Sequence, residues 1–192
     1  MKILVTGGCG YIGTPLIQSL LKQNHKITCI DNQWFGCYLQ KHKNLRIIKK
    51  DIRDLKDKYF KNIDTVIHLA NIANDPAVKL LPTLSWDVNV LASYKLINQC
   101  VDNKVKKFIY ASSGSVYGIK DEENVTEDLD LVPISVYNKT KMCAERIFLS
   151  YKDKIKIHCI RPATVCGMSP RMRLDVSVNM LTFQALNVLT MF

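Results

Sequence analysis

The 192-residue sequence contains no uninterrupted apolar run long enough to cross a bilayer, although 47% of its residues are hydrophobic. Its first residues have the pattern of a core strand and lack the charged, then apolar, pattern of a signal peptide. Repeats, low-complexity tracts and linkers are also absent. These absences predict a cytoplasmic protein with no membrane partner, and the length allows one domain with a full core.

The sequence also lacks a metal-binding cysteine pattern. Its seven cysteines include no C-x-x-C pair, and several lie inside apolar runs. An odd number of scattered cysteines is typical of reduced and mostly buried thiols. We therefore predict no metal site.

Acidic residues are scarce, with 17 Asp and Glu against 27 Lys and Arg, which gives a formal net charge of +10. Such an excess can indicate a nucleic-acid partner or a field that attracts an anionic substrate. The lysines are spread along the chain and form only short pairs such as Lys49-Lys50. Because spread charge is typical of a solvated surface, the sequence argues against a nucleic-acid partner.

The most informative stretch is the beginning of the chain, which reads MKILVTGGCGYIG. Residues 2–6 are apolar and rich in β-branched side chains, which is typical of a buried strand. Gly7, Gly10 and Gly13 follow at a spacing of three, and an apolar pattern of helical period begins at Ile12. A strand, a glycine turn and a helix in this order predict a dinucleotide-binding site, where the pyrophosphate meets backbone amides at the helix N-terminus.

Further strands and helices alternate along the chain. The patterns predict strands at 26–30, 45–48, 63–69 and 105–111, and helices at 84–102, 137–149 and 176–186. This alternation predicts an α/β fold, namely a Rossmann-like doubly wound parallel sheet with helices on both faces.

Acidic and small residues follow the predicted strands. Asp31 lies about twenty residues beyond the glycine turn, where a carboxylate binds the adenosine ribose and favours NAD over NADP. The loop from Asn32 to Gly36 is expected to border the adenine. Asp51 and Ile52 are placed to meet the adenine, although an Asp that caps a helix has the same pattern. Ala70 lets a cofactor lie against the backbone.

Two other polar residues have predicted positions. We interpret His68 as a structural residue of the 63–69 strand and not as a catalyst. Asn89, inside the 84–102 helix, either faces the cofactor or lies on the surface.

A serine-rich segment and a Tyr-x-x-x-Lys pair indicate catalysis. The 105–111 strand runs into SSGSVYG, and Tyr137 and Lys141 share one face of a helix. A lysine ammonium near a phenol lowers the pKa of the phenol and gives a base usable near neutral pH. Tyr-x-x-x-Lys alone is often a surface pair. In this chain it follows a glycine turn, an acidic strand end and a serine-rich strand end, and the four features in this order are more specific for a catalytic site than any one of them.

The chain resembles the extended short-chain dehydrogenase/reductase family, in its nucleotide-sugar epimerase/dehydratase branch, and is similar to UDP-glucose 4-epimerases. The resemblance covers nearly the whole chain and rests on TGGCGYIG, Asp31, DIRD, HLAN, SSGSVYG, YNKTK and RPATVCG. It implies NAD as the cofactor and a nucleotide sugar as the substrate. The cofactor-binding residues that it implies are Gly7, Gly10, Tyr11, Ile12, Gly13, Asp31, Asn32, Asp51, Ile52, Leu69, Ala70, Asn71, Tyr137, Lys141 and Ala163.

The resemblance also implies a mechanism. Ser113, Tyr137 and Lys141 are the catalytic residues, and Ser113, Ser115 and Tyr137 contact the substrate. Tyr137 takes a proton from a sugar hydroxyl at C4 while hydride moves to NAD, and the ketone is then reduced from its other face. Dehydratases of the family usually carry Thr-Asp-Glu where this chain has Ser113-Gly114-Ser115, which favours an epimerase or a 4-reductase.

Three departures from the family pattern stand out. Asn71 replaces an alanine, and Cys166 replaces a tyrosine, where we expect a buried thiol that serves for packing. Family members continue beyond the position of Phe192 into a part that closes over the sugar. We therefore expect an NAD-binding domain at 1–170 and the start of a truncated substrate-binding part at 171–192.

Alternatives remain open at this point. The same residues fit a 4-reductase or dehydrogenase that releases its product after one hydride transfer. A non-catalytic NAD-binding or RNA-binding protein on the same fold is a third interpretation. The apolar faces of the helices near 84–103 and 137–151 are compatible with a homodimer.

Overall fold

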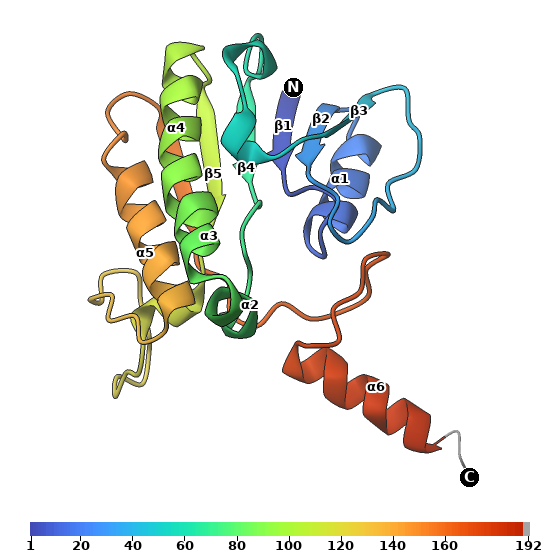
Figure 1. Cartoon of the computed structure of the whole chain (residues 1–192), viewed down its shortest axis with the longest axis vertical. Helices are drawn as coiled ribbons and strands as arrows, with labels where there is room; N and C mark the ends of the chain where they lie inside the picture. Colours follow the sequence, from blue (N-terminus) through green and yellow to red (C-terminus); the bar gives the residue numbers. More distant parts are fainter. Residues whose placement is uncertain (190–192) are drawn as a thin grey trace.

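The computed structural model of the chain describes residues 1–189. Its centre is a six-stranded parallel sheet with the strand order β3-β2-β1-β4-β5-β6. The strands are β1 (Lys2–Thr6), β2 (Lys26–Asp31), β3 (Leu45–Lys49), β4 (Thr65–His68), β5 (Lys107–Ala111) and β6 (Lys156–Ile160). The chain adds strands outward from β1 to β3, returns to β4, and then continues to β6 (Figure 1). The strand order therefore reverses beside β1, and ligands of such sheets bind outside the carboxyl ends of the strands at this point.

Both faces of the sheet are covered by apolar packing. Ile3 and Val5 are buried in a cluster with Ile17 of α1 (Gly13–Lys22), whereas Leu4 is buried in the other cluster. That second cluster includes residues of α4 (Ala92–Asp102) and α5 (Val136–Leu149), which lie side by side in Figure 1. Successive strand residues point to opposite faces, so a strand covered on both faces is apolar throughout. The predicted doubly wound fold with helices on both faces is confirmed.

Three elements differ from the sequence prediction. The predicted 84–102 helix is divided into α3 (Pro82–Trp86), a π-helical turn, η3 (Asp87–Leu91), and α4. The short helix α2 (Asp75–Leu80) and the edge strand β6 were not predicted. The side chains of β6 alternate between exposed and half-buried, because β6 lies at the edge of the sheet. This alternation is the pattern of a half-exposed strand, but it covers only five residues and was not recognised in the sequence.

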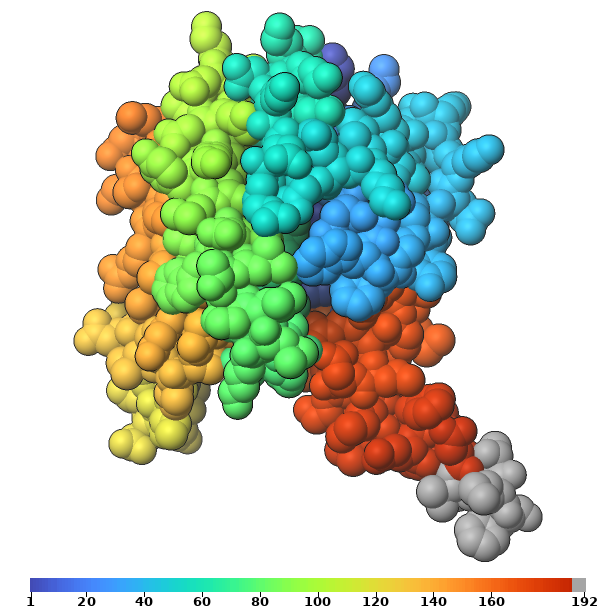
Figure 2. Space-filling model, viewed as in Figure 1, coloured from blue at the N-terminus to red at the C-terminus, as the bar shows by residue number. Residues whose placement is uncertain are grey.

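After β6 the chain passes beneath the sheet and ends in α6 (Ser177–Leu189), so the predicted 176–186 helix is confirmed. Figures 1 and 2 show α6 projecting away from the body of the molecule. Its apolar side chains are largely exposed, including Val178, Leu181 and Phe183. The expected boundary at residue 170 stays a prediction.

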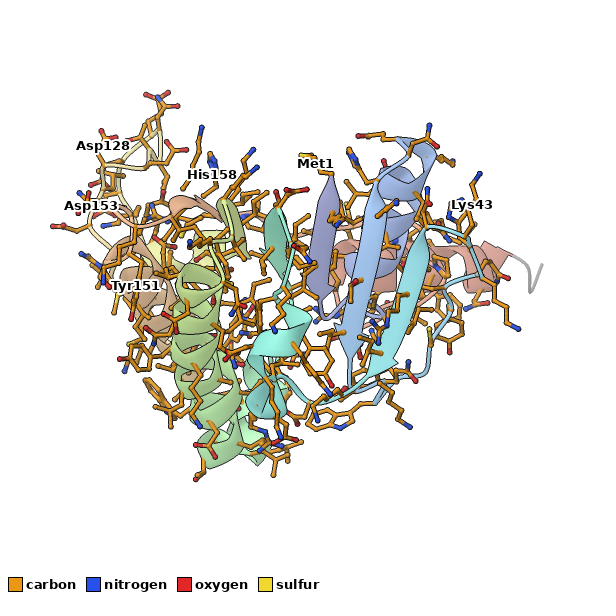
Figure 3. All side chains as sticks on the ribbon, turned by 90° about the horizontal axis from the view of Figure 1, so that it is seen from above. Met1, Lys43, Asp128, Tyr151, Asp153 and His158 are labelled. Carbon is orange, nitrogen blue, oxygen red and sulfur yellow. The ribbon has the colours of Figure 1, made fainter. Side chains whose placement is uncertain are left out.

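The basic residues are distributed widely over the surface. Lys43, before edge strand β3, and His158, in edge strand β6, lie at opposite ends of the sheet in Figure 3. No helix within residues 1–189 is long and apolar enough to span a membrane. The same residues contain no group of three or more His, Cys, Asp or Glu side chains arranged to hold a metal ion.

Candidate functional site

A cavity of about 660 Å³ opens at the carboxyl ends of the central strands. Its volume is in the range of small-molecule sites. It is lined by every residue that the sequence assigned to the cofactor and by all three predicted catalytic residues. These residues come from segments spread over most of the chain, and the parallel sheet brings their strand ends to one edge.

The glycine turn has the geometry that close backbone packing requires. Gly7 has a φ of +73°, and a Cβ there would lie 2.5 Å from the backbone nitrogen of Ala70. A Cβ on Gly13 would lie 2.6 Å from the carbonyl oxygen of Gly7. A Cβ on Gly10 would approach only that same oxygen, at 3.2 Å. Gly7 and Gly13 are therefore required for packing, and Gly10 leaves the cavity side of the turn open.

The turn that leads into α1 can accept an anion. The N–H of Thr14 already donates to the carbonyl oxygen of Gly10 at 3.1 Å and Pro15 has no N–H, so the amides that can bind a ligand are those before Thr14. Ile12 is the N-cap residue, and no side chain caps the first amides of the helix. The unpaired N–H groups of a helix N-terminus and its partial positive charge favour phosphate binding. The geometry of the turn and of α1 thus fits a dinucleotide pyrophosphate.

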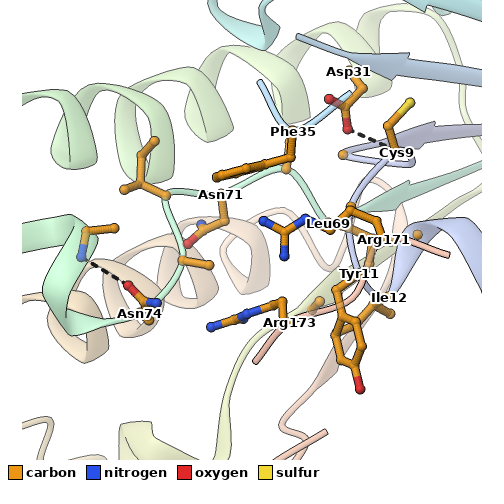
Figure 4. Close-up of a pocket in the computed structure, with 18 of the residues that line it drawn as sticks. Cys9, Tyr11, Ile12, Asp31, Phe35, Leu69, Asn71, Asn74, Arg171 and Arg173 are labelled. Atoms are coloured by element: carbon orange, nitrogen blue, oxygen red, sulfur yellow. Dashed lines mark hydrogen bonds between the residues drawn. The ribbon is translucent and has the colours of Figure 1, made fainter. Parts of the chain in front are cut away.

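Two carboxylates also line the cavity, at the ends of β2 and β3. Asp31 accepts a hydrogen bond from the backbone N–H of Cys9 at 3.0 Å (Figure 4). It also accepts from the backbone N–H of Gln33 at 2.7 Å, and the two bonds fix its orientation. Asp51 accepts from the guanidinium of Arg53 at 2.8 Å and caps the turn η1 (Ile52–Asp54). The hydrogen bonds from Arg53 hold the pKa of Asp51 below its usual value. Asp51 therefore caps a helix and also lines the cavity.

Asn71 fits a ligand in this cavity. Both polar atoms of its side-chain amide are buried and have no hydrogen-bond partner among residues 1–189. An unsatisfied buried polar group costs about 1–3 kcal/mol. A bound ligand with hydrogen-bonding groups would remove this cost, which a family alanine at the position would not incur.

Asn89 has neither of the two positions predicted from the sequence. It is fully buried in η3, where its Oδ1 accepts from the backbone N–H of Ile72 at 2.8 Å. Its Nδ2 donates to the carbonyl oxygen of Ile72 (3.2 Å) and to the hydroxyl of Thr140 (3.0 Å). Asn89 therefore fastens the loop after β4 to α5, and the π-helical turn carries the residue that makes this link.

Tyr137 and Lys141 both face the cavity, but burial changes their ionisation. Lys141 Nζ donates to the carbonyl oxygen of Ala111 at 2.7 Å and lies 5.8 Å from the ring centroid of Tyr137. Burial lowers the pKa of Lys141 to about 7. Burial also raises the pKa of Tyr137 to about 12. The sequence predicts that Lys141 lowers the pKa of this phenol, but burial has the largest effect on Tyr137, and the cation that lowers its pKa in this structure is Arg173. The role of Tyr137 as a base stays a prediction.

The serines form a short hydrogen-bond chain. Ser115 donates to Oδ1 of Asn138 at 2.6 Å, so the 2.7 Å contact between the two serine hydroxyls is a bond from Ser113 to Ser115. Ser113 lines the cavity and Ser115 does not. The roles of both serines toward substrate stay predictions.

His68 is a structural residue of the core. Its ring nitrogens bond to Thr6 Oγ1 at 2.7 Å and Ser93 Oγ at 3.1 Å. Burial, with a smaller effect of Lys141, lowers the pKa of His68 to about 3. The prediction of a structural role agrees with this environment. The prediction for Cys166 was wrong, because this side chain is exposed.

The sequence analysis missed one wall of the cavity, formed by residues 171–175. The guanidinium of Arg171 lies 4.1 Å from the ring centroid of Phe35, and Arg173 makes a bidentate contact with Asp175. Asp175 also accepts from Nδ2 of Asn74 at 2.6 Å. Figure 4 shows both guanidinium groups extending into the cavity. The segment therefore adds two guanidinium groups and one carboxylate to a site whose other charged lining residues are Asp31, Asp51, Lys50 and Lys141.

Tyr11 anchors this segment to the glycine turn. Its hydroxyl donates to the carbonyl oxygen of Gly167 at 2.7 Å and accepts from Nδ2 of Asn179 at 3.0 Å. Ser169 Oγ donates to the carbonyl oxygen of Tyr11 at 2.8 Å. These contacts join residues more than 150 positions apart, so no local spacing in the sequence signals them.

Comparison with known proteins agrees with this geometry. A family model described as the NAD-dependent epimerase/dehydratase family matches residues 3–187. The chain belongs to this family. It is 33% identical over 176 residues to a UDP-glucose 4-epimerase of Lactobacillus helveticus, a match that covers 88% of this chain and 53% of the relative. It is 32% identical to a probable UDP-arabinose 4-epimerase of Arabidopsis thaliana, covering 90% of this chain and 46% of that protein.

Solved structures of family members have the same fold. The UDP-glucuronic acid 4-epimerase of Bacillus cereus, in complex with UDP-glucuronic acid and NAD, matches with a TM-score of 0.85 and 33% identity. That match covers 97% of this chain and 63% of the other. The UDP-glucose 4-epimerase of Thermus thermophilus with NAD matches with a TM-score of 0.85 and 27% identity, over 95% and 61% of the two chains. The chain spans about half the length of the curated relatives it matches.

Proposed function

We propose that this chain binds NAD in the 660 Å³ cavity and takes part in the epimerisation of a nucleotide sugar by reversible hydride transfer at C4. The observation that carries this proposal is the convergence of the glycine turn, Asp31 and the Tyr137–Lys141 pair on one cavity. The names of the relatives support the epimerase class.

Each part of the cavity suits one part of the cofactor. The amides of the glycine turn, up to Gly13 at the start of α1, bind the pyrophosphate. Arg171 has no carboxylate partner among residues 1–189 and supplies positive charge on the opposite wall. Asp31 accepts hydrogen bonds from the adenosine ribose and repels a 2′-phosphate, which favours NAD over NADP.

Tyr137 is the group that takes the proton from the sugar hydroxyl. Bound NAD supplies a hydride acceptor and a positively charged ring. Because burial raises the pKa of Tyr137 to about 12, its phenolate needs a nearby cation, and Arg173 acts in this direction. Lys141 serves as a second cation when it is protonated, and the hydroxyl of Ser113 turns from Ser115 toward the substrate oxygen.

Cofactor binding is tested by calorimetry with the full chain. We expect NAD to bind at least tenfold more tightly than NADP, a difference of about 1.4 kcal/mol. Asp31→Asn should reduce NAD affinity at least tenfold and reduce the difference in affinity between NAD and NADP. Asp153→Ala, at an exposed position outside the cavity, should leave both the NAD affinity and this difference unchanged. Equal affinity for both cofactors, or no binding of either, would contradict the proposed site.

Catalysis is tested by incubating the NAD-loaded chain with UDP-hexoses and UDP-uronic acids and separating the products. Formation of the 4-epimer that is lost in Tyr137→Phe supports an epimerase. A keto product that accumulates together with an equal amount of reduced cofactor supports the dehydrogenase alternative. Bound NAD with neither product would show that this chain alone is not the complete enzyme.

A further inference from the structure

Three thiols meet beside the cofactor cavity. Cys9 lies in the glycine turn, Cys29 in β2, and Cys37 in the loop between β2 and β3. Cys9 Sγ is 3.5 Å from Cys37 Sγ and 3.9 Å from Cys29 Sγ. Cys9 and Cys29 are buried, whereas Cys37 is exposed to solvent. An exposed thiol in contact with a buried one can react first with a soluble oxidant and then pass the reaction on.

The two possible pairs differ in their freedom to move. A disulfide requires the sulfurs to approach to about 2.05 Å. Cys29 is held in β2, which is hydrogen-bonded to strands on both sides. Cys37 lies in an irregular exposed loop, so its sulfur can approach Cys9 without breaking the sheet. The geometry therefore favours the bond between Cys9 and Cys37.

We propose that Cys9 and Cys37 form a reversible disulfide at the edge of the cofactor cavity, with a soluble disulfide such as oxidised glutathione as the oxidant. The thiolate of Cys37 attacks one glutathione sulfur, which forms a mixed disulfide and releases one glutathione. The thiolate of Cys9 then attacks the Cys37 sulfur and releases the second glutathione. Two protein thiols are oxidised, one glutathione disulfide is reduced, and the two thiol protons end on the two glutathiones.

The reaction is slow near neutral pH. The hydrogen bond to Cys29 and burial raise the pKa of the Cys9 thiol, and burial raises the pKa of the Cys37 thiol. Since only the thiolate attacks a disulfide, few molecules react at a given moment. The pair therefore responds to sustained oxidation rather than to brief exposure.

The bond would also change the cofactor cavity. Trp34 and Phe35 line that cavity from the loop that carries Cys37. The backbone N–H of Cys9 donates to Asp31 at 3.0 Å, so the turn and the acidic strand end are already linked. Drawing Cys37 toward Cys9 shifts this wall, and we expect NAD affinity to fall at least fivefold. This consequence, unlike the bond itself, rests on the proposed binding of NAD.

The bond is tested on the full chain, reduced with dithiothreitol and then incubated with oxidised glutathione at pH 8. We expect a mass loss of about 2 Da from the two hydrogens removed and a peptide that links Cys9 to Cys37. Cys37→Ser should abolish this link, and Cys166→Ser, which removes another exposed thiol, should retain it. Glutathione adducts without the internal link, or a link between Cys9 and Cys29, would overturn the proposal.

Calorimetry on the same samples tests the consequence for the cofactor. NAD should bind at least fivefold more weakly to the oxidised chain, and dithiothreitol should restore the affinity. Cys37→Ser should give the same affinity before and after oxidation. Equal affinity of the oxidised and reduced wild-type chains would overturn the effect on the cavity. If the reduced chain binds no NAD, the proposed function fails, and the peptide map still decides whether the thiols pair.

Discussion

Replacing Asn89 with alanine is predicted to destabilise the chain strongly and to loosen one wall of the cavity. Asn89 is fully buried, and its amide holds both backbone polar groups of Ile72 and the hydroxyl of Thr140. Ile72 belongs to the loop after β4, which lines the cavity together with Asn71. Removal of this amide therefore affects stability and ligand binding at the same time.

The size of the effect follows from the three lost hydrogen bonds. Each contributes about 0.5–1.5 kcal/mol net, and buried partners left unsatisfied raise the cost further. We expect Asn89→Ala to lower the free energy of unfolding by about 3 kcal/mol. For a chain of this size, that corresponds to a melting temperature lower by about 6–12 °C.

The matched control is Asn98→Ala, on α4. The side chain of Asn98 bonds to the carbonyl oxygen of Tyr94 at 2.9 Å and to the hydroxyl of Tyr151 at 2.8 Å, but it is partly exposed. Water can replace these bonds, so we expect a loss of about 1 kcal/mol or less. Urea unfolding of both variants measures the difference. Equal losses in the two variants would refute the argument that Asn89 acts as a buried clamp.

Three further predictions concern charges in and near the cavity. Arg171→Ala should weaken NAD binding about threefold to tenfold in calorimetry, because it removes an unpaired cation from the cavity, whereas Arg146→Ala, at an exposed position on α5, should not. For His68, the unfolded chain binds a proton at a higher pH than the folded chain, whose His68 pKa is about 3. The stability that His68 contributes is therefore present above pH 6.5 and is lost as the pH falls below this value. In urea unfolding, the free energy of unfolding of His68→Gln should fall by about 3 kcal/mol less than that of the wild type between pH 7 and pH 4.5. For Lys141, burial lowers the pKa to about 7, so Lys141→Met should melt at a higher temperature than wild type at pH 7. The difference in melting temperature between the two proteins should shrink toward pH 9, because folded Lys141 is then neutral while the unfolded wild-type chain still keeps most of its Lys141 proton. An equal difference at pH 7 and pH 9 would contradict the lowered pKa of Lys141.

The central strands and the glycine turn could be predicted because their signals are local. β1 is apolar throughout because both faces of the sheet are covered, and Gly7 and Gly13 follow it at fixed spacing. β6 lies at the edge of the sheet, and its half-buried Ile157 and Cys159 alternate with exposed residues, a short period-two strand signal that the sequence analysis did not use. The division of the 84–102 helix coincides with the buried link made by Asn89, which helical periodicity does not reveal.

The cavity could be predicted as far as strand ends determine it. Parallel strands place their carboxyl ends at one edge, so residues that follow β1, β2, β4 and β5 line one space. The loop that carries Phe35 was expected to border the adenine, and it lines the cavity. The 171–175 segment could not be predicted, because its place depends on contacts such as Tyr11 with Gly167 and Asn179. These contacts join residues more than 150 positions apart in the sequence.

The ionisation of the site depends on burial, which the Tyr-x-x-x-Lys spacing does not specify. The spacing correctly places Tyr137 and Lys141 on one side of α5, but both side chains are removed from water. Burial disfavours the charged form of each, so the phenol pKa rises and the ammonium pKa falls. Because burial disfavours the phenolate of Tyr137, a cation from another part of the chain is needed to stabilise it. Arg173, which lowers the pKa of Tyr137, belongs to the segment that Tyr11 anchors. The pKa of the phenol therefore depends on the position of that segment.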